Sequence, residues 1–193
     1  MRARWAERAR SRGGRAIISN CDLSQIEQRL LEGIAEVEGN SDVKGWNCPK
    51  MIAVEKITTK EGLQDAFGIR EVVFVVEQEV DAAEEYDEFD DSSVHFLAKM
   101  DGSPVGTARW RFTANGVKLE RFAVRKEARG KGAGQALVAA LLADIDLCPD
   151  GKGKKKYLHA QIHAMPLYAK FGFQPVGDPF EECAILHYKM ELS

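Results

Sequence analysis

The chain has 193 residues, of which 45% are hydrophobic and 30% are charged. This is the composition of an ordinary globular domain, so it excludes a wholly disordered chain and a fibrous repeat. No apolar run approaches the roughly 18 residues that cross a membrane, and no apolar segment follows the N-terminal arginines as it would in a secretory signal. We therefore expect no membrane partner.

The four cysteines are scattered along the chain without a CxxC spacing. This pattern predicts neither a disulfide framework nor a metal site. It is typical of a reducing compartment, so we expect a cytoplasmic protein.

The formal net charge of −3 is distributed unevenly. Residues 1–20 contain six arginines and one glutamate, whereas the rest of the chain has an excess of acidic residues. A nucleic-acid-binding protein usually has its basic residues on a folded face, so this distribution argues against a nucleic-acid partner. The basic start predicts a disordered arm, and an organelle-targeting peptide is the alternative.

Apolar residues recur at helical spacing between residues 23 and 37, which predicts one amphipathic helix. A polar stretch with Gly45 and Pro49 follows and predicts a domain boundary. We therefore expect an N-terminal extension at residues 1–50 and one compact domain at residues 51–193.

Within this domain, residues 51–57 alternate as a strand, and residues 59–77 predict a helix whose valine-rich end also suits a strand. Three strands follow, joined by Asp-Gly and Asn-Gly dipeptides that are typical of hairpin turns. We expect these strands at residues 94–100, 105–112 and 117–124, then a helix from about residue 136, a strand at 157–162, a short helix at 166–171 and a last strand at 184–192. This order predicts an α+β fold, a single sheet flanked by helices.

The segment RGKGAG at residues 129–134 lies between a predicted strand and a predicted helix. Unpaired N–H groups at the start of a helix, together with the helix dipole, favour an anion, so the segment predicts a phosphate-binding turn. A Walker A loop is excluded because Lys131 is followed by Gly132 and not by Ser or Thr. A dinucleotide fingerprint is excluded because its third glycine is missing.

The pattern Arg/Gln-x-x-Gly-x-Gly/Ala, after a strand that ends in Ala-Val, resembles the coenzyme A loop of the GNAT superfamily of N-acetyltransferases. The sequences LHAQ at 158–161 and LYAKFGF at 167–173 look like the fifth strand of that family and the short helix that carries its tyrosine. Residues within 74–109 and 180–190 are similar to the bacterial ElaA/YjcF-type branch, which is related to glucosamine-6-phosphate N-acetyltransferases. The resemblance covers residues 51–193 and implies the GNAT fold, with a mixed, mostly antiparallel sheet.

The resemblance also implies acetyl-CoA as co-substrate, no metal, and direct transfer of an acetyl group to a primary amine of a small molecule, such as an amino sugar or a polyamine-like amine. A protein or peptide acceptor is one alternative, and an acyl-CoA-binding module without turnover is another. A homodimer stays open. The coenzyme-binding residues that it implies are Phe122, Ala123, Val124, Arg129, Gly130, Lys131, Gly132, Ala133 and Gly134.

Acyl transfer to an amine needs a base for the amine, a donor for the oxyanion and an acid for the departing thiolate. By resemblance, Tyr168 is the acid, and a backbone N–H near Ala123 or Val124 is the oxyanion donor. A core tyrosine with a hydrogen-bonded hydroxyl is the structural alternative for Tyr168.

Glu120 is the expected base, because related enzymes carry a glutamate there and a partly buried carboxylate can have a raised pKa. Pairing of this carboxylate with arginine is the alternative, and His95 and His187 are further candidate bases. The arginines concerned are Arg109, Arg111 and Arg121.

Nine acidic residues lie between positions 77 and 91, where the superfamily admits the acceptor. We expect a solvated loop for most of them. As a cluster, they would raise the local concentration of a cationic amine.

Overall fold

The computed structural model describes residues 51–192, so the arm, the helix and the domain boundary predicted for residues 1–50 lie outside the described part. The strands are β1 (Ile52–Lys56), β2 (Val94–Met100), β3 (Ser103–Thr113), β4 (Gly116–Val124), β5 (Lys156–Gln161), β6 (Gln174–Pro175), β7 (Phe180–Glu182) and β8 (Ile185–Leu192). The helices are α2 (Lys60–Arg70), which continues as a π-helical segment (Glu71–Val76), α3 (Ala82–Glu85), α4 (Ala133–Leu147) and α5 (Met165–Ala169). None of the described helices is long and apolar enough to cross a membrane.

The strands form one sheet in the order β1-β2-β3-β4-β5-β8-β6, with β7 also paired to β8. Only β4 and β5 run parallel, and the other neighbours are antiparallel. The predicted Asp-Gly turn joins β2 to β3, and both Asp101 (φ 52°) and Gly102 (φ 81°) have positive φ, as a two-residue hairpin turn requires. The predicted α+β fold with a mixed, mostly antiparallel sheet is confirmed.

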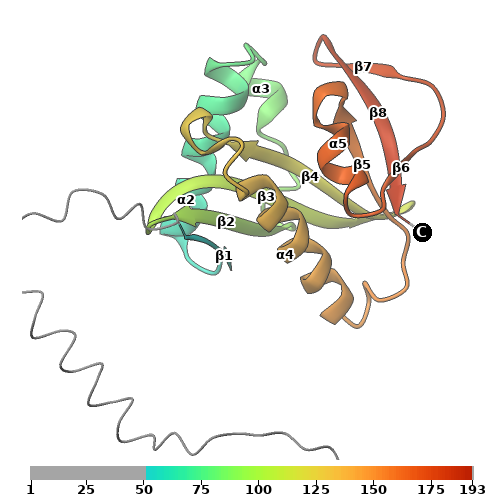
Figure 1. The fold of residues 1–193 in the computed structure, drawn as a ribbon, viewed down its shortest axis with the longest axis horizontal. Coiled ribbons are helices and arrows are strands. Elements are labelled where there is room, and N and C mark those ends of the chain that lie inside the picture. The colour runs from blue at the N-terminus through green and yellow to red at the C-terminus, as the bar shows by residue number, and fades with distance from the viewer. Residues whose placement is uncertain (1–50, 193) are drawn as a thin grey trace, which may run out of the picture. The chain divides into compact units, whose positions relative to one another are not determined.

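Strands β4 and β5 separate soon after they begin. They pair only at Val117 with Lys156 and at Lys118 with Tyr157. Further along, Glu120 of β4 lies opposite Arg109 of β3, and Ala123 lies opposite Thr107. Two residues of β4 and one residue of β3 lie between these pairs, so β4 contains an extra residue. Such a bulge bends a strand, and this one lies where the two strands diverge. The sheet therefore has an internal gap with a free edge on β4 (Figure 1).

Helices α2 and α4 cover opposite faces of the sheet (Figure 1). Successive side chains of a strand point to opposite faces. On β2, Phe96 and Ala98 pack in the cluster that contains Leu141 of α4, whereas Leu97 packs in the cluster that contains Ile69 of α2. The larger core lies beneath α4 and extends to α5, so the short tyrosine-bearing helix is fixed to the sheet.

Candidate active site

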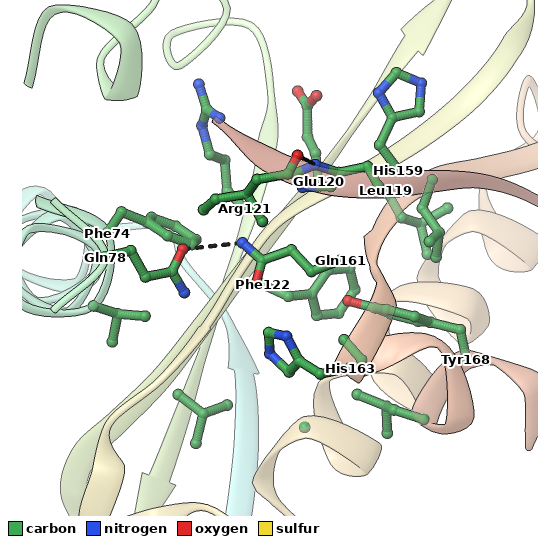
Figure 2. Close-up of a pocket in the computed structure, with 18 of the residues that line it drawn as sticks. Phe74, Gln78, Leu119, Glu120, Arg121, Phe122, His159, Gln161, His163 and Tyr168 are labelled. Atoms are coloured by element: carbon green, nitrogen blue, oxygen red, sulfur yellow. Dashed lines mark hydrogen bonds between the residues drawn. The ribbon is translucent and has the colours of Figure 1, made fainter. Parts of the chain in front are cut away.

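A cavity of about 760 Å³ lies where β4 and β5 separate (Figure 2). Its walls come from β4, β5, α5, the start of α4, the end of the π-helical segment and the β7–β8 hairpin. Its size is that of a pocket for a small molecule or a coenzyme arm. The predicted site residues that line it are Glu120, Phe122, Val124, Arg129, Gly130, Gly132, Gly134 and Tyr168.

Three predicted coenzyme-binding residues do not direct their side chains into this cavity. Ala123 is buried in the cluster beneath α2, and Ala133 is buried in a cluster with Val105. The Nζ of Lys131 donates a hydrogen bond of 2.5 Å to the carbonyl of Glu127 in the preceding turn. Only the backbone of these residues is placed to contribute to the site.

The glycine-rich loop has the conformation of an anion-binding turn. Gly130 (φ 73°) and Gly132 (φ 94°) lie in the left-handed region, which other residues rarely adopt, and Gly132 caps α4. A Cβ atom at either position would meet no atom within 4 Å, so the loop borders open space. Because α4 is 15 residues long and starts here, its first N–H groups and its dipole favour a phosphate.

Arg129 holds this loop in place. Its Nε donates to the carbonyl of Val124 at 2.9 Å, and its Nη2 pairs with Glu77 at the end of the π-helical segment. The Arg129 side chain, which is part of the loop pattern, therefore connects the loop to β4 and to the end of the π-helical segment on the other side of the cavity.

The hydroxyl of Tyr168 points into the cavity, toward Phe122 and Gln161 (Figure 2). The ring is buried, and burial raises the pKa of the phenol well above its ordinary value, so the group stays protonated. Within residues 51–192, no side chain or backbone group forms a hydrogen bond with this hydroxyl. The structure therefore places a protonated, unpaired donor on the cavity wall.

Glu120 is surrounded by cations. Its Oε1 accepts hydrogen bonds from Arg109 Nε (3.1 Å), Arg109 Nη2 (2.9 Å) and Arg111 Nε (2.7 Å), and Lys118 Nζ lies 2.9 Å from its Oε2. Burial alone would raise the pKa of this carboxyl, but Lys118, Arg109 and the hydrogen bond from Arg111 hold it below its usual value. The expected raised pKa is wrong, and the alternative of pairing with Arg109 and Arg111 is confirmed.

The acidic segment divides into exposed and inward-facing residues. Six of its nine members are exposed, as expected for a solvated loop: Glu77, Glu79, Asp81, Glu84, Glu88 and Asp91. Glu85, Asp87 and Asp90 turn inward and pair with three arginines of the sheet and α2, which are Arg70, Arg109 and Arg121.

These pairs are close. Asp87 Oδ2 lies 2.6 Å from Arg109 Nη2 and 3.1 Å from Arg121 Nη2, and Asp90 Oδ1 lies 2.6 Å from Arg70 Nη1. Burial opposes ionisation of Asp87, but the hydrogen bonds and charge of Arg109 and the charge of Arg121 lower its pKa to about 2. Because the inward carboxylates are already paired with arginines, they are not available to attract a cationic amine.

Of the polar residues on the cavity wall that faces away from α4, sequence reasoning proposed His187 as a base but assigned no role to His159, Gln161 or Glu182. Alternation along β5 puts His159 and Gln161 on that wall, and register places His187 of β8 opposite Gln161. His159 Nδ1 lies 3.1 Å from Glu182 Oε2, and this hydrogen bond lowers the pKa of Glu182 to about 2. The period-two pattern was visible in the sequence, but the pairing of β5 with β8 was not.

The two histidines proposed as alternative bases differ in position. His95 is buried on β2 with its Nε2 2.8 Å from the carbonyl of Asp90, burial lowers its pKa, and it does not line the cavity. His187 is also buried but lines the cavity. The structure therefore separates His95 from the site and keeps His187 in it.

The fold and the glycine-rich loop at a gap between parallel strands define an acyltransferase of the GNAT type. The family model for an acetyltransferase (GNAT) domain matches residues 58–193. The chain is 39% identical over 132 residues to a protein of Bacillus subtilis (strain 168) named uncharacterized N-acetyltransferase YjcF, and this match covers 68% of the chain and 92% of the relative.

Solved structures agree with this match. Escherichia coli ElaA is 28% identical with a TM-score of 0.66, over 74% of this chain and all (100%) of that one. An acyl-CoA N-acyltransferase from Pseudomonas aeruginosa is 26% identical with a TM-score of 0.64, over 75% of this chain and 99% of that one. The chain belongs to the GNAT family of acetyltransferases, and its resemblance to the ElaA/YjcF-type proteins is confirmed.

Proposed function

We propose that the protein transfers the acetyl group of acetyl-CoA directly to a primary amine of a small molecule. The observation that carries this proposal is that one cavity contains the glycine-rich loop, the free edge of β4 and the hydroxyl of Tyr168. Acetyl-CoA would supply the activated thioester, and the residues of the chain would bind it, orient it and move the protons.

The site fits the coenzyme in two respects. The loop from Arg129 to Gly134 would hold the pyrophosphate through backbone N–H groups at the start of α4. Beyond Lys118, the edge of β4 is free of β5, so its N–H and C=O groups can pair with the amides of the pantetheine arm. We keep a backbone N–H at Ala123 or Val124 on this strand as the proposed oxyanion donor.

Tyr168 is our proposed acid. Its raised pKa keeps the phenol protonated, so the hydroxyl can donate a hydrogen bond and then a proton to the sulfur as negative charge develops there. A buried phenolate would be the wrong charge state for this role, and burial disfavours it. An acyl-CoA-binding module without turnover would not need such a donor.

Cys183 gives a reason to prefer direct transfer. This residue lines the cavity, but its hydrogen bond to Glu84 and partial burial raise the pKa of its thiol to about 11. The thiolate is the nucleophilic form of cysteine, so a raised pKa makes a covalent acetyl-cysteine step unfavourable.

The charges around the cavity favour an amino-sugar-like acceptor over a polyamine. Cations and anions both line it, among them Lys118, Arg121 and Glu182, and the acidic segment offers few free inward carboxylates. A polyamine would need an excess of unpaired carboxylates. A small amine with several hydroxyl groups suits this mixed polar lining better.

Thiol release from acetyl-CoA with a panel of amino sugars, polyamines and lysine peptides tests the proposal. Acceptor-dependent thiol release, with amino sugars ahead of polyamines and peptides, is the expected result. Saturating coenzyme A should also raise the melting temperature, because it binds the folded form only. A melting shift without thiol release from any amine would favour the binding module, and better turnover of peptides would favour a protein acceptor.

A further inference from the structure

We propose that His187 is the general base that removes a proton from the acceptor amine. This inference rests on the proposed N-acetyl transfer and assigns the proton acceptor of that same site. Glu120 is a poor base because its carboxylate is already engaged by Arg109, Arg111 and Lys118, which hold its pKa low.

The backbone fixes the tautomer of His187. Its Nδ1 lies 2.7 Å from the carbonyl oxygen of Ile185. A carbonyl oxygen can only accept a hydrogen bond, so Nδ1 carries the hydrogen of the neutral ring. The lone pair of the imidazole then lies on Nε2, which is the arrangement that a general base requires.

The second nitrogen is free and accessible. Within residues 51–192, Nε2 of His187 forms no hydrogen bond with another residue. In this part of the chain, the side-chain nitrogen and oxygen atoms that are both buried and unpaired are Arg121 Nε and Arg125 Nε. Nε2 of His187 is unpaired but is not one of these atoms, so it is accessible. Since His187 lines the cavity and is only 8% exposed, its free nitrogen opens to the cavity.

The ring of His187 is also held in its plane. Phe180 of β7 stacks on it with centroids 6.0 Å apart and an interplanar angle of 25°. The polar groups on the same wall are Gln161 and His159 of β5, Glu182 of β7, and Lys118 and Glu120 of β4. A base held in one rotamer and one tautomer can accept a proton without reorganisation.

His159 is the rival histidine. Its Nδ1 is paired with Glu182, and its side chain is 28% exposed. Figure 2 shows that its ring is turned away from Tyr168. Because the acid and the base must serve the same reacting carbonyl, the better candidate is His187, which lies opposite Gln161 in the register of β5 and β8.

The proton balance is complete with these residues. Nε2 of His187 takes one proton from the ammonium group, and the freed nitrogen lone pair forms the C–N bond to give a tetrahedral intermediate. The C–S bond breaks when this intermediate collapses. The sulfur receives a proton from Tyr168, which is replaced by the second proton lost from the nitrogen. His187 returns the first proton to solvent, so one proton is released per acetylation.

His187→Asn tests this role, because an asparagine amide can keep the hydrogen bond to Ile185 and lacks the basic nitrogen. With an alkylamine that is protonated at pH 7, kcat should fall on the order of 10²-fold. With methoxyamine, a primary amine that is mostly neutral at that pH, the fall should be at least ten times smaller. The melting temperature and the Kd for acetyl-CoA should not change.

Equal losses with both amines, or full activity, would overturn the proposal, as would a loss in His159→Asn with none in His187→Asn. His95→Gln is the control, since this buried histidine lies outside the cavity, and it should keep the wild-type ratio between the two amines. If His187→Asn does not fold, His187→Gln carries the same comparison. A wild-type protein that releases no thiol with any amine would instead refute the proposed function.

Discussion

The ring of Tyr168 lies edge to face against Phe122, with centroids 5.4 Å apart and an interplanar angle of 73°. It also contacts Phe173 in an edge-to-face arrangement at 6.3 Å. Phe122 belongs to β4 and Phe173 to the segment after α5, so the contact with Phe122 crosses the gap between the diverging strands. An aromatic pair of this kind contributes about 0.5 to 1.5 kcal/mol beyond its buried area. The ring is therefore held without help from its hydroxyl.

Tyr168→Phe should keep this packing and remove only the donor. We expect kcat for acetyl transfer to fall on the order of 10²-fold or more, with little change in the melting temperature or in the Kd for acetyl-CoA. Stopped assays of thiol release and thermal melts measure the two effects. Tyr157→Phe is the control, because that buried tyrosine hydrogen-bonds Thr113 at 3.0 Å and does not line the cavity. A variant that loses stability but keeps its turnover would make Tyr168 a core residue.

Much of the fold could be predicted because its main strands and helices have clear local signals. The turn dipeptides at Asp101 and Asn115 fixed the ends of β2, β3 and β4 to within two residues. The short elements α3, β6 and β7 were missed, since two to four residues are too few to show a period. The valine-rich run is helical although valine favours strands, because Val73 packs against the sheet beneath α2.

The site was predictable where it depends on local sequence and not where it depends on pairing between distant segments. The glycine-rich loop and Tyr168 are local motifs, and the structure brings them to one cavity. The ionisation of Glu120 depends on Arg109 of the neighbouring strand, and the tautomer of His187 depends on a hairpin turn at Ile185. Neither geometry can be read from residue spacing alone.

Gly132→Asp should weaken coenzyme binding more than Gly132→Ala. Both substitutions put a side chain at φ 94°, so both should lower stability by a similar amount. Only the aspartate adds a negative charge at the start of α4, where the phosphates are proposed to bind. We expect a Kd for coenzyme A at least tenfold higher for aspartate than for alanine, measured by calorimetry.

Gly153 offers a matched control for this comparison. It also has a positive φ (75°), and a Cβ atom there would meet no atom within 4 Å, but it does not line the cavity. Gly153→Asp and Gly153→Ala should therefore bind coenzyme A equally. Equal affinity in the two Gly132 variants would contradict the proposed position of the pyrophosphate.

Arg109→Met should strongly destabilise the fold. This residue is 0% exposed, and its guanidinium pairs with Asp87, Asp90 and Glu120. Removing it takes one cationic partner from all three carboxylates at once, and loss of one member of a buried ion pair typically costs about 3 to 5 kcal/mol. Urea unfolding at pH 7 measures the loss.

Lys56→Met is the control for this prediction. It removes an exposed pair with Asp144 and should cost less than about 1 kcal/mol. Similar losses in both variants would mean that the buried network contributes no more than a surface pair.

The last prediction concerns stability at acid pH. The pKa of Asp87 is lowered from 3.8 to about 2 in the folded protein, so below pH 3.8 the unfolded chain binds this proton more readily. The stabilisation from Asp87 is therefore complete above pH 3.8 and is lost as the pH falls toward 2.

Asp87→Asn removes this stabilisation at every pH. In urea unfolding, the variant should be less stable than wild type at pH 5, and the difference should shrink between pH 4 and pH 2. Asp91→Asn, which changes an exposed carboxylate of the same segment, should show no such narrowing. A difference for Asp87→Asn that is constant over this range would mean that the pairing with Arg109 and Arg121 does not lower its pKa.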